Sequence, residues 1–195
     1  MLRKMTLREH LRASTAQAHE SIEANPMLAR LLAQDLSEAE YRRILERYFG
    51  FFQPLEKDLS NLAEFVNRVP AFAARMRSER LRLDLQTLGL EISEIESLPR
   101  CEALPPHTKL AEFVGVLYVL EGSNLGGKLI AKHLRALPFT RPACLNFFES
   151  PDVSENWKSF LTFLNDVDSG NPSFHRDAAQ AAQETFRSLD RWMAR

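Results

Sequence analysis

The sequence predicts an all-α protein, and three observations lead to that prediction. Apolar residues recur every three or four positions along most of the chain, which is the spacing of one helix face. No stretch keeps the strict alternation of apolar and polar residues that marks a half-buried strand. Helix-start signals precede several of the apolar patterns. Because 195 residues with 45% hydrophobic content can close one sizeable core, we expect a single domain over residues 1–195.

Two capping boxes mark the helices of the N-terminal part. Thr6 and Glu9 have the spacing of such a box, in which each caps the other's backbone, and Asn25-Pro26 is expected to end the helix that they start. Ser37 and Glu40 repeat the pattern at the start of a second, long helix that we expect Pro54 to kink. The apolar stripe of the first helix consists of Leu7, Leu11, Ala18 and Ile22.

The C-terminal part reads as three further long helices separated by loops. One or two helices are expected before Gly89, and the prolines within residues 91–106 indicate a connection. Helices are then predicted over about 107–136, near 154–167, and from Asn171-Pro172 to near Trp192.

Glycine is concentrated in the predicted helix over 107–136, which holds four of the chain's seven. Each glycine costs a helix about 0.8–1.0 kcal/mol relative to alanine, so some other interaction must compensate. At 100° per residue, Gly115, Gly122 and Gly126 fall within about 40° of one another, which leaves one face almost bare. Close packing against another helix explains such a face, but the adjacent pair Gly126-Gly127 favours a softened, kinked helix lying over a flat ligand.

Composition and charge exclude several functional classes. The 25 basic residues nearly balance the 26 acidic ones, so no basic footprint for nucleic acid is present. No apolar run approaches the length of a membrane span, and residues 1–5 lack the apolar core of a signal peptide, so we expect a cytoplasmic protein. Cys101 and Cys144 are too few for a disulfide framework or a zinc site and read as reduced thiols.

One of the five histidines stands out by its position. His10 projects away from the apolar stripe of the first helix, whereas His19 lies about 80° from the centre of that stripe, at the edge of a possible pocket. An imidazole there can bind a metal through one ring nitrogen while Glu23, four residues on, orients the other. A histidine beside an apolar face, together with a glycine-faced helix, suggests a planar iron macrocycle held between two helices.

Two motifs make the chain resemble the haem oxygenases, most closely the bacterial forms that accompany bacteriophytochromes. The motifs are residues 15–20, Thr-Ala-Gln-Ala-His-Glu, and residues 120–127, Leu-Glu-Gly-Ser-Asn-Leu-Gly-Gly, which are similar to that family's proximal and distal helices. The likeness continues to the Trp-Lys-Ser-Phe segment at 157–160. It implies a multi-helix haem oxygenase-like fold in which haem, both substrate and cofactor, is sandwiched between the proximal and distal helices.

The resemblance also implies a reaction and a set of roles. Haem would react with O2 and reducing equivalents from a ferredoxin, flavodoxin or reductase, giving biliverdin, carbon monoxide and ferrous iron. His19 would be the axial iron ligand. The stretch from Gly122 to Gly127, which includes Gly126, would cover the opposite face of the haem and shape oxygen activation. Ser123 stands where mammalian-type members carry an aspartate, so protons would pass through backbone groups, waters or another side chain.

The pocket mouth needs cations for the haem propionates. Arg12, seven residues before His19 and on nearly the same side of the helix, resembles the family's propionate contacts. Lys158 is a second candidate and Lys132 a third, although each is equally an ordinary solvated charge. Tyr118 either faces the haem edge or packs in the core.

Two other functions fit the same sequence. The first is a haem-binding or haem-sequestering protein that keeps the cradle without turnover. The second is a related helical fold without haem, such as the thiaminase-like group, whose cysteine nucleophile finds no counterpart around Cys101 or Cys144.

Overall fold

Side-chain caps start three long helices where the sequence predicts them. In this computed structural model, which describes residues 5–194, the Thr6 hydroxyl accepts from the backbone of Glu9 and starts α1 (Leu7–Glu23). Ser37 starts α3 (Glu38–Ser60) in the same way, and Asn171 starts α10 (Pro172–Met193). Residues 1–4, most of the stretch 1–5 that lacks the apolar pattern of a signal peptide, and residue 195 lie outside the described part of the chain.

The two remaining long helices also agree with the prediction, whereas the shorter elements differ from it. The expected helix over 107–136 is α8 (Leu110–Leu134), and the one near 154–167 is α9 (Val153–Val167). Three helices, rather than one or two, lie between α3 and Gly89, and residues 91–106, expected to be mostly connection, contain one more; short helices carry too few turns to show a period. The short elements are α2 (Pro26–Ala29), η1 (Arg30–Leu32), α4 (Ala63–Val66), α5 (Phe72–Arg75), α6 (Ser78–Thr87), α7 (Ile92–Ser97) and η2 (Pro142–Cys144).

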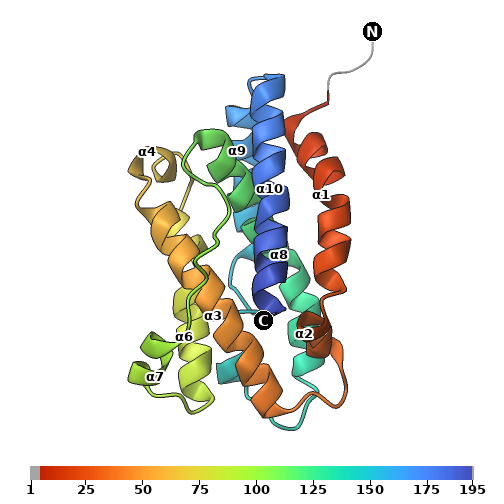
Figure 1. Ribbon diagram of the computed structural model, residues 1–195, viewed down its shortest axis with the longest axis vertical. Helices are drawn as coiled ribbons and strands as arrows, with labels where there is room; N and C mark the ends of the chain where they lie inside the picture. The colour runs from red at the N-terminus through yellow and green to blue at the C-terminus, as the bar shows by residue number, and fades with distance from the viewer. Residues whose placement is uncertain (1–4, 195) are drawn as a thin grey trace.

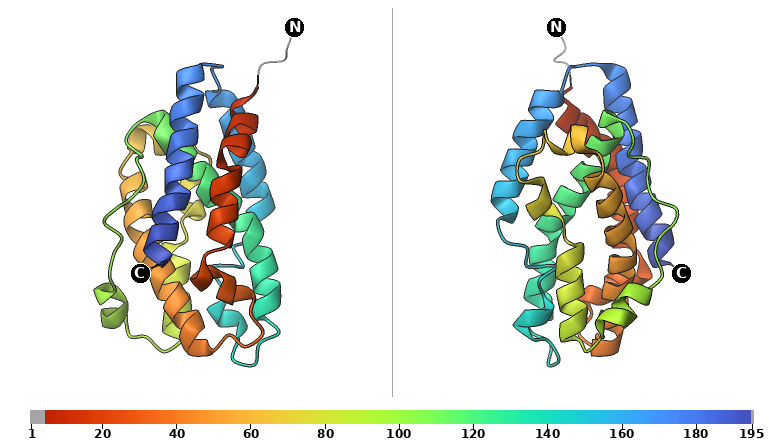
Figure 2. Two further views of the ribbon diagram at one scale, coloured as in Figure 1. Left: turned by 45° about the vertical axis from the view of Figure 1, so that its right-hand side comes forward. Right: turned by 90° about the vertical axis from the view of Figure 1, so that its left-hand side faces the viewer.

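The long helices form a bundle elongated along one direction, with no strand among residues 5–194 (Figure 1). α10 packs against both α8 and α1, and α6 packs against α3. The views in Figure 2 show the chain between α7 and α8 running along the bundle from one end to the other. α3 continues as one helix through Pro54. α8 continues as one helix through Gly126 and Gly127.

Gly115 corrects one expectation about the glycine-rich helix. A Cβ atom built there would lie 2.1 Å from the carbonyl oxygen of Ala178 and 3.0 Å from the backbone nitrogen of Ala182, both in α10. This glycine therefore serves close packing of α8 against α10 and does not belong to an open, ligand-facing surface. Gly115 points in nearly the same direction from the helix axis as Gly122, but the surroundings differ. α10 lies beside Gly115, whereas the space beside Gly122 is open.

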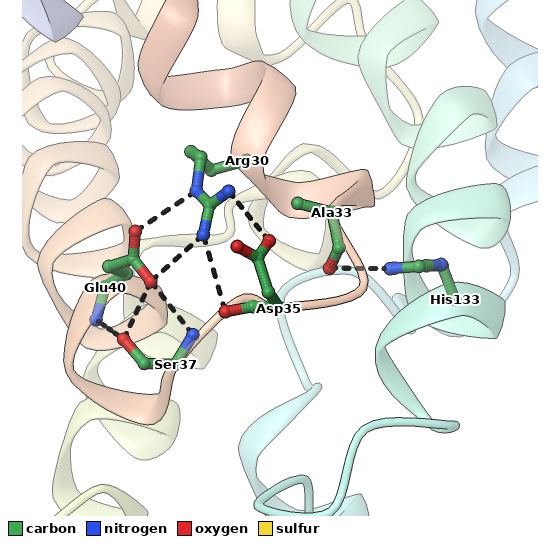
Figure 3. Close-up of polar contacts among 6 residues, drawn as sticks. All are labelled: Arg30, Ala33, Asp35, Ser37, Glu40 and His133. Atoms are coloured by element: carbon green, nitrogen blue, oxygen red, sulfur yellow. Dashed lines mark hydrogen bonds and ion pairs between the residues drawn. The ribbon is translucent and has the colours of Figure 1, made fainter.

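Polar contacts hold the connection between α1 and α3 against the rest of the molecule (Figure 3). The Arg30 guanidinium lies between two carboxylates, 2.9 Å from Asp35 Oδ1 and 3.1 Å from Glu40 Oε1. Nε2 of His133, near the end of α8, lies 3.2 Å from the Ala33 carbonyl oxygen. The connection is thereby fixed to the C-terminal end of α8.

Candidate functional site

Two adjoining cavities of about 650 and 460 Å³ lie between α1 and α8. They share lining residues from three helices, so they are two parts of one cleft, the α1–α8 cleft. The shared residues are His19, Glu23, Val119, Ser123 and Phe186. Arg8 and Arg12 line the larger cavity, whereas the smaller one is lined mostly by apolar side chains, together with Arg77.

His19 projects into this cleft from the edge of the buried face of α1. Leu11 and Ile22 of the same helix are buried, while 57% of the His19 side chain is exposed. Its Nδ1 lies 3.5 Å from Glu23 Oε1, as the four-residue spacing predicts, and its ring meets Phe186 edge-on at 5.6 Å. Among the described residues none hydrogen-bonds to Nε2, so that nitrogen is free to bind a ligand.

No other histidine and no cysteine lines either cavity. His10 lies beside His175, whose Nε2 is 2.6 Å from Asp168 Oδ1, away from the cleft. Both cysteines are buried in the fold. Within residues 5–194 no group of three or more His, Cys, Asp or Glu can hold a metal ion.

Gly122 and Gly126 leave open space on the wall opposite His19. A Cβ atom built at either position would have no neighbouring atom within 4 Å beyond its own part of the helix. Gly127 also lines the cleft, but its Cβ would lie 3.1 Å from the carbonyl oxygen of Phe148, so it serves packing as well. A flat ligand can thus approach the backbone of α8 at Gly122 and Gly126.

Exposed leucines border the open space. Leu125 and Leu129 of α8 are 42% and 65% exposed, and Leu32 of η1 is 50% exposed. All three line the cleft. An apolar surface of this kind, gathered around a cavity, is typical of a site that an apolar ligand covers.

Arg77 is the functional candidate that sequence analysis missed. It is 4% exposed, and its Nη2 donates a hydrogen bond to Ser123 Oγ at 2.9 Å. Its guanidinium carbon lies 4.4 Å from the ring centre of Phe52 and 4.6 Å from that of Phe147. Burial lowers the pKa of Arg77 to about 10, so the side chain stays charged at neutral pH. Nothing in the sequence marks this arginine, because arginines between short helices are usually solvated.

A buried ion pair fixes α8 one residue before Gly122. Arg75 Nη1 lies 3.0 Å from Glu121 Oε2, and both side chains are almost completely buried. The same guanidinium donates to the Asn156 carbonyl and to the Ser159 hydroxyl of α9. Removing one partner of such a pair leaves a buried charge uncompensated, so the pair specifies where the glycine face lies.

The lining of the larger cavity includes two arginines and the rings of Tyr118 and Trp157. Arg12, which the sequence predicts, is joined there by Arg8, and neither forms an ion pair with a described residue. Burial raises the pKa of Tyr118, whose ring lies 6.1 Å from that of Trp157. Lys158 is not among the lining residues, and its ammonium lies 3.5 Å from Glu155 Oε2.

The structure thus brings most of the predicted site residues to one cleft. Those that line it are His19, Arg12, Tyr118, Gly122, Ser123, Gly126 and Gly127. Lys158 and Lys132 do not line it. Among the helices within residues 5–194, none combines the length and apolar character that a membrane crossing requires.

Comparison with known sequences gives one family. The model of the family described as Heme oxygenase matches residues 5–195. Heme oxygenase PigA of Pseudomonas aeruginosa is 28% identical over 180 residues, which cover 91% of this chain and 86% of that protein. The heme oxygenase of Xanthomonas campestris pv. campestris is 32% identical over 126 residues, covering 64% of this chain and 71% of the relative.

Solved structures share the fold. The heme oxygenase from Leptospira interrogans superposes with a TM-score of 0.74 at 21% identity, over 97% of this chain and 99% of that one. The NO- and CO-bound heme oxygenase from Neisseria meningitidis superposes with a TM-score of 0.79 at 24% identity, over 97% of this chain and 90% of that one. Heme oxygenase-1 from Synechocystis in complex with heme superposes with a TM-score of 0.80 at 15% identity, over 97% of this chain and 91% of that one. The predicted all-α fold is therefore confirmed.

Proposed function

This chain belongs to the haem oxygenase family, and from that membership we propose that it binds haem in the α1–α8 cleft and cleaves it to biliverdin, carbon monoxide and ferrous iron. One observation carries the proposal: a free imidazole and an open glycine face line the same cleft. When bound, haem supplies the iron that activates O2 and the porphyrin that is cleaved, with electrons from a ferredoxin, flavodoxin or reductase. The cytoplasmic location expected from the sequence stays a prediction.

His19 is the proposed metal ligand. Its Nε2 has no hydrogen-bond partner among the described residues, and Glu23 beside Nδ1 favours the tautomer that leaves Nε2 unprotonated.

Arg8 and Arg12 are the proposed propionate contacts. Both line the larger cavity and form no ion pair with a residue of the described part of the chain, so their guanidinium groups are available for charge-assisted hydrogen bonds to a ligand. Tyr118, between these arginines and Gly122 along the cavity wall, is proposed to face the macrocycle edge. Lys158, which is not a lining residue, has no support from position for this role.

Gly122, Gly126 and Ser123 are proposed to shape oxygen activation. The open space beside the glycines admits a small ligand and ordered water near the backbone of α8. Ser123 Oγ donates to the Leu120 carbonyl and accepts from Arg77, so its second lone pair is available to a water in the cleft. The buried positive charge of Arg77 polarises this hydroxyl.

Single-turnover chemistry tests the proposal. Protein loaded with one equivalent of hemin is exposed to O2 and ascorbate in the presence of catalase, and the products are separated by chromatography. We expect one equivalent each of biliverdin and carbon monoxide, and the chromatogram identifies the biliverdin isomer. Recovery of intact hemin would contradict the proposal and favour a haem-sequestering protein.

A further inference from the structure

Asp84 of α6 is a buried carboxylate without a cation. It is 0% exposed, and no ion-pair partner lies within 4 Å among the described residues. Burial raises its pKa to about 6 against the opposing effect of its hydrogen bonds. A carboxylate in such a place is costly unless its oxygens are well satisfied, so its partners indicate what it does.

Those partners all belong to the loop between η2 and α9. Asp84 Oδ1 accepts from the backbone nitrogen of Asn146 at 2.8 Å and from its Nδ2 at 2.7 Å. Asp84 Oδ2 accepts from the backbone nitrogen of Phe147 at 2.8 Å. Two consecutive N–H groups are thus held by the two oxygens of one side chain, which fixes the orientation of the Phe147 peptide.

The held loop reaches the α1–α8 cleft at two points. The Phe147 ring packs against the Arg77 guanidinium, with 4.6 Å from the guanidinium carbon to the ring centre. The Phe148 carbonyl closely approaches Gly127 of α8. Asp84 itself lines neither cavity. A displacement of the Phe147 backbone would therefore move the ring that holds Arg77 against Ser123.

We propose that Asp84 is a positioning residue for the reaction: it holds residues 146 and 147 so that Phe147 keeps the Arg77 guanidinium in hydrogen-bond contact with Ser123. This inference rests on the function proposed above. An asparagine at position 84 keeps the shape but turns one acceptor into an N–H donor facing the loop amides. Asp84→Asn therefore breaks the clamp with little change in volume.

Amide hydrogen exchange of the ligand-free protein tests the clamp without reference to activity. We expect residues 145–148 to exchange at least tenfold faster in Asp84→Asn than in the wild type, with α1 and α10 unchanged. Asp168→Asn is the matched control, because Asp168 also accepts from a backbone nitrogen, that of Leu7, but contacts no part of the loop. Unchanged exchange at 145–148 would overturn the proposal even if the protein degrades haem.

The hemin-loaded protein tests the link to Arg77. We expect Asp84→Asn to keep its hemin affinity within twofold and to lower the biliverdin yield per hemin consumed between two- and tenfold. In an Arg77→Lys background the same change should have no further effect, since it acts through Arg77. An equal loss in both backgrounds would overturn the proposal. If Asp84→Asn does not fold, Phe147→Leu tests the same link and is expected to show the same lack of additivity with Arg77→Lys.

The amide-exchange and hemin-turnover experiments together distinguish failure of this inference from failure of the proposed function. A wild type that binds hemin but yields no biliverdin contradicts the proposed function, while the exchange experiment still reports on the clamp. Fast exchange in Asp84→Asn together with losses that add to those of Arg77→Lys contradicts the positioning role alone.

Discussion

The Arg77 guanidinium donates a hydrogen bond to the Ser123 hydroxyl over 2.9 Å, across 46 positions of sequence. This contact places a buried positive charge directly behind the hydroxyl that lines the α1–α8 cleft. Serine alone offers no charge at the place where mammalian-type haem oxygenases carry an aspartate. In this chain the Ser123 hydroxyl accepts from a buried cation, Arg77, and donates to the Leu120 carbonyl.

Replacing Arg77 by lysine is expected to slow haem turnover. Lysine keeps a positive charge but loses the planar group that packs against the rings of Phe52 and Phe147 and donates to Ser123. We expect roughly a tenfold lower rate of biliverdin formation with unchanged hemin affinity. Stopped-flow absorbance of the hemin complex with ascorbate measures the rate. Ser123→Ala should give a loss of similar size, and a wild-type rate in both variants would rule out the pair as a proton path.

Alanine at two glycines of α8 is expected to change stability in opposite directions. Gly122→Ala should stabilise the ligand-free protein by about 0.5–1 kcal/mol, because the new Cβ enters open space and alanine favours helix. Gly115→Ala should destabilise it by about 1–3 kcal/mol, because its Cβ would meet the Ala178 carbonyl. Urea unfolding gives both values. The same sign for the two variants would show that the two glycines do not differ as described.

A larger side chain at position 122 is expected to block the ligand. Gly122→Leu should leave the ligand-free protein folded, since nothing lies within 4 Å of the new Cβ, but weaken hemin binding at least tenfold. Titration at the Soret band measures this affinity, and circular dichroism checks the fold. Normal hemin binding by Gly122→Leu would place the ligand somewhere other than against this face.

Removing Arg8 or Arg12 is expected to weaken hemin binding, whereas removing Lys158 is not. Arg12→Ala and Arg8→Ala should each weaken hemin binding by roughly five- to tenfold, the loss of one charge-assisted hydrogen bond. Lys158→Ala is the matched control and should stay within twofold, because Lys158 does not line the cleft. A loss on Lys158→Ala as large as that on Arg12→Ala would mean that the propionates lie toward α9.

The stabilising contribution of Glu40 to the fold is expected to be lost in acid. Hydrogen bonds from the backbone and hydroxyl of Ser37, and then from Arg30, lower the pKa of Glu40 to about 2 (Figure 3). Because this folded pKa lies below the ordinary value of 4.5, the contribution is complete above about pH 4.5 and is lost as pH falls toward 2. Thermal unfolding of Glu40→Gln should therefore show a lower Tm than the wild type at pH 7 and a vanishing difference near pH 2. A constant difference across this range would contradict the assignment.

The sequence predicts the long helices because the signals that start them are local. Thr6, Ser37 and Asn171 cap the next turn of their own helices, and that chemistry does not depend on the rest of the fold. The edge position of His19 and its contact with Glu23 follow in the same way from one helix. The pairing of His19 with Gly122 across one cleft came from the family resemblance, because spacing alone does not say which helices face each other.

Two features needed the tertiary structure. Gly115 and Gly122 share a face by angle, but α10 covers the first and the cleft opens beside the second. Arg77 lies between two short helices in the sequence, and only the fold brings it to Ser123 and against two aromatic rings. Both depend on contacts between residues far apart in the sequence, which periodicity does not report.

Titration of the ligand-free protein with hemin, alongside His19→Ala, tests the central claim most directly. We predict that the wild type saturates at one equivalent with the absorption spectrum of a histidine-ligated haem, and that His19→Ala loses that spectrum. No saturation in the wild type, or the same spectrum in His19→Ala, would contradict a haem held between His19 and the glycine face of α8.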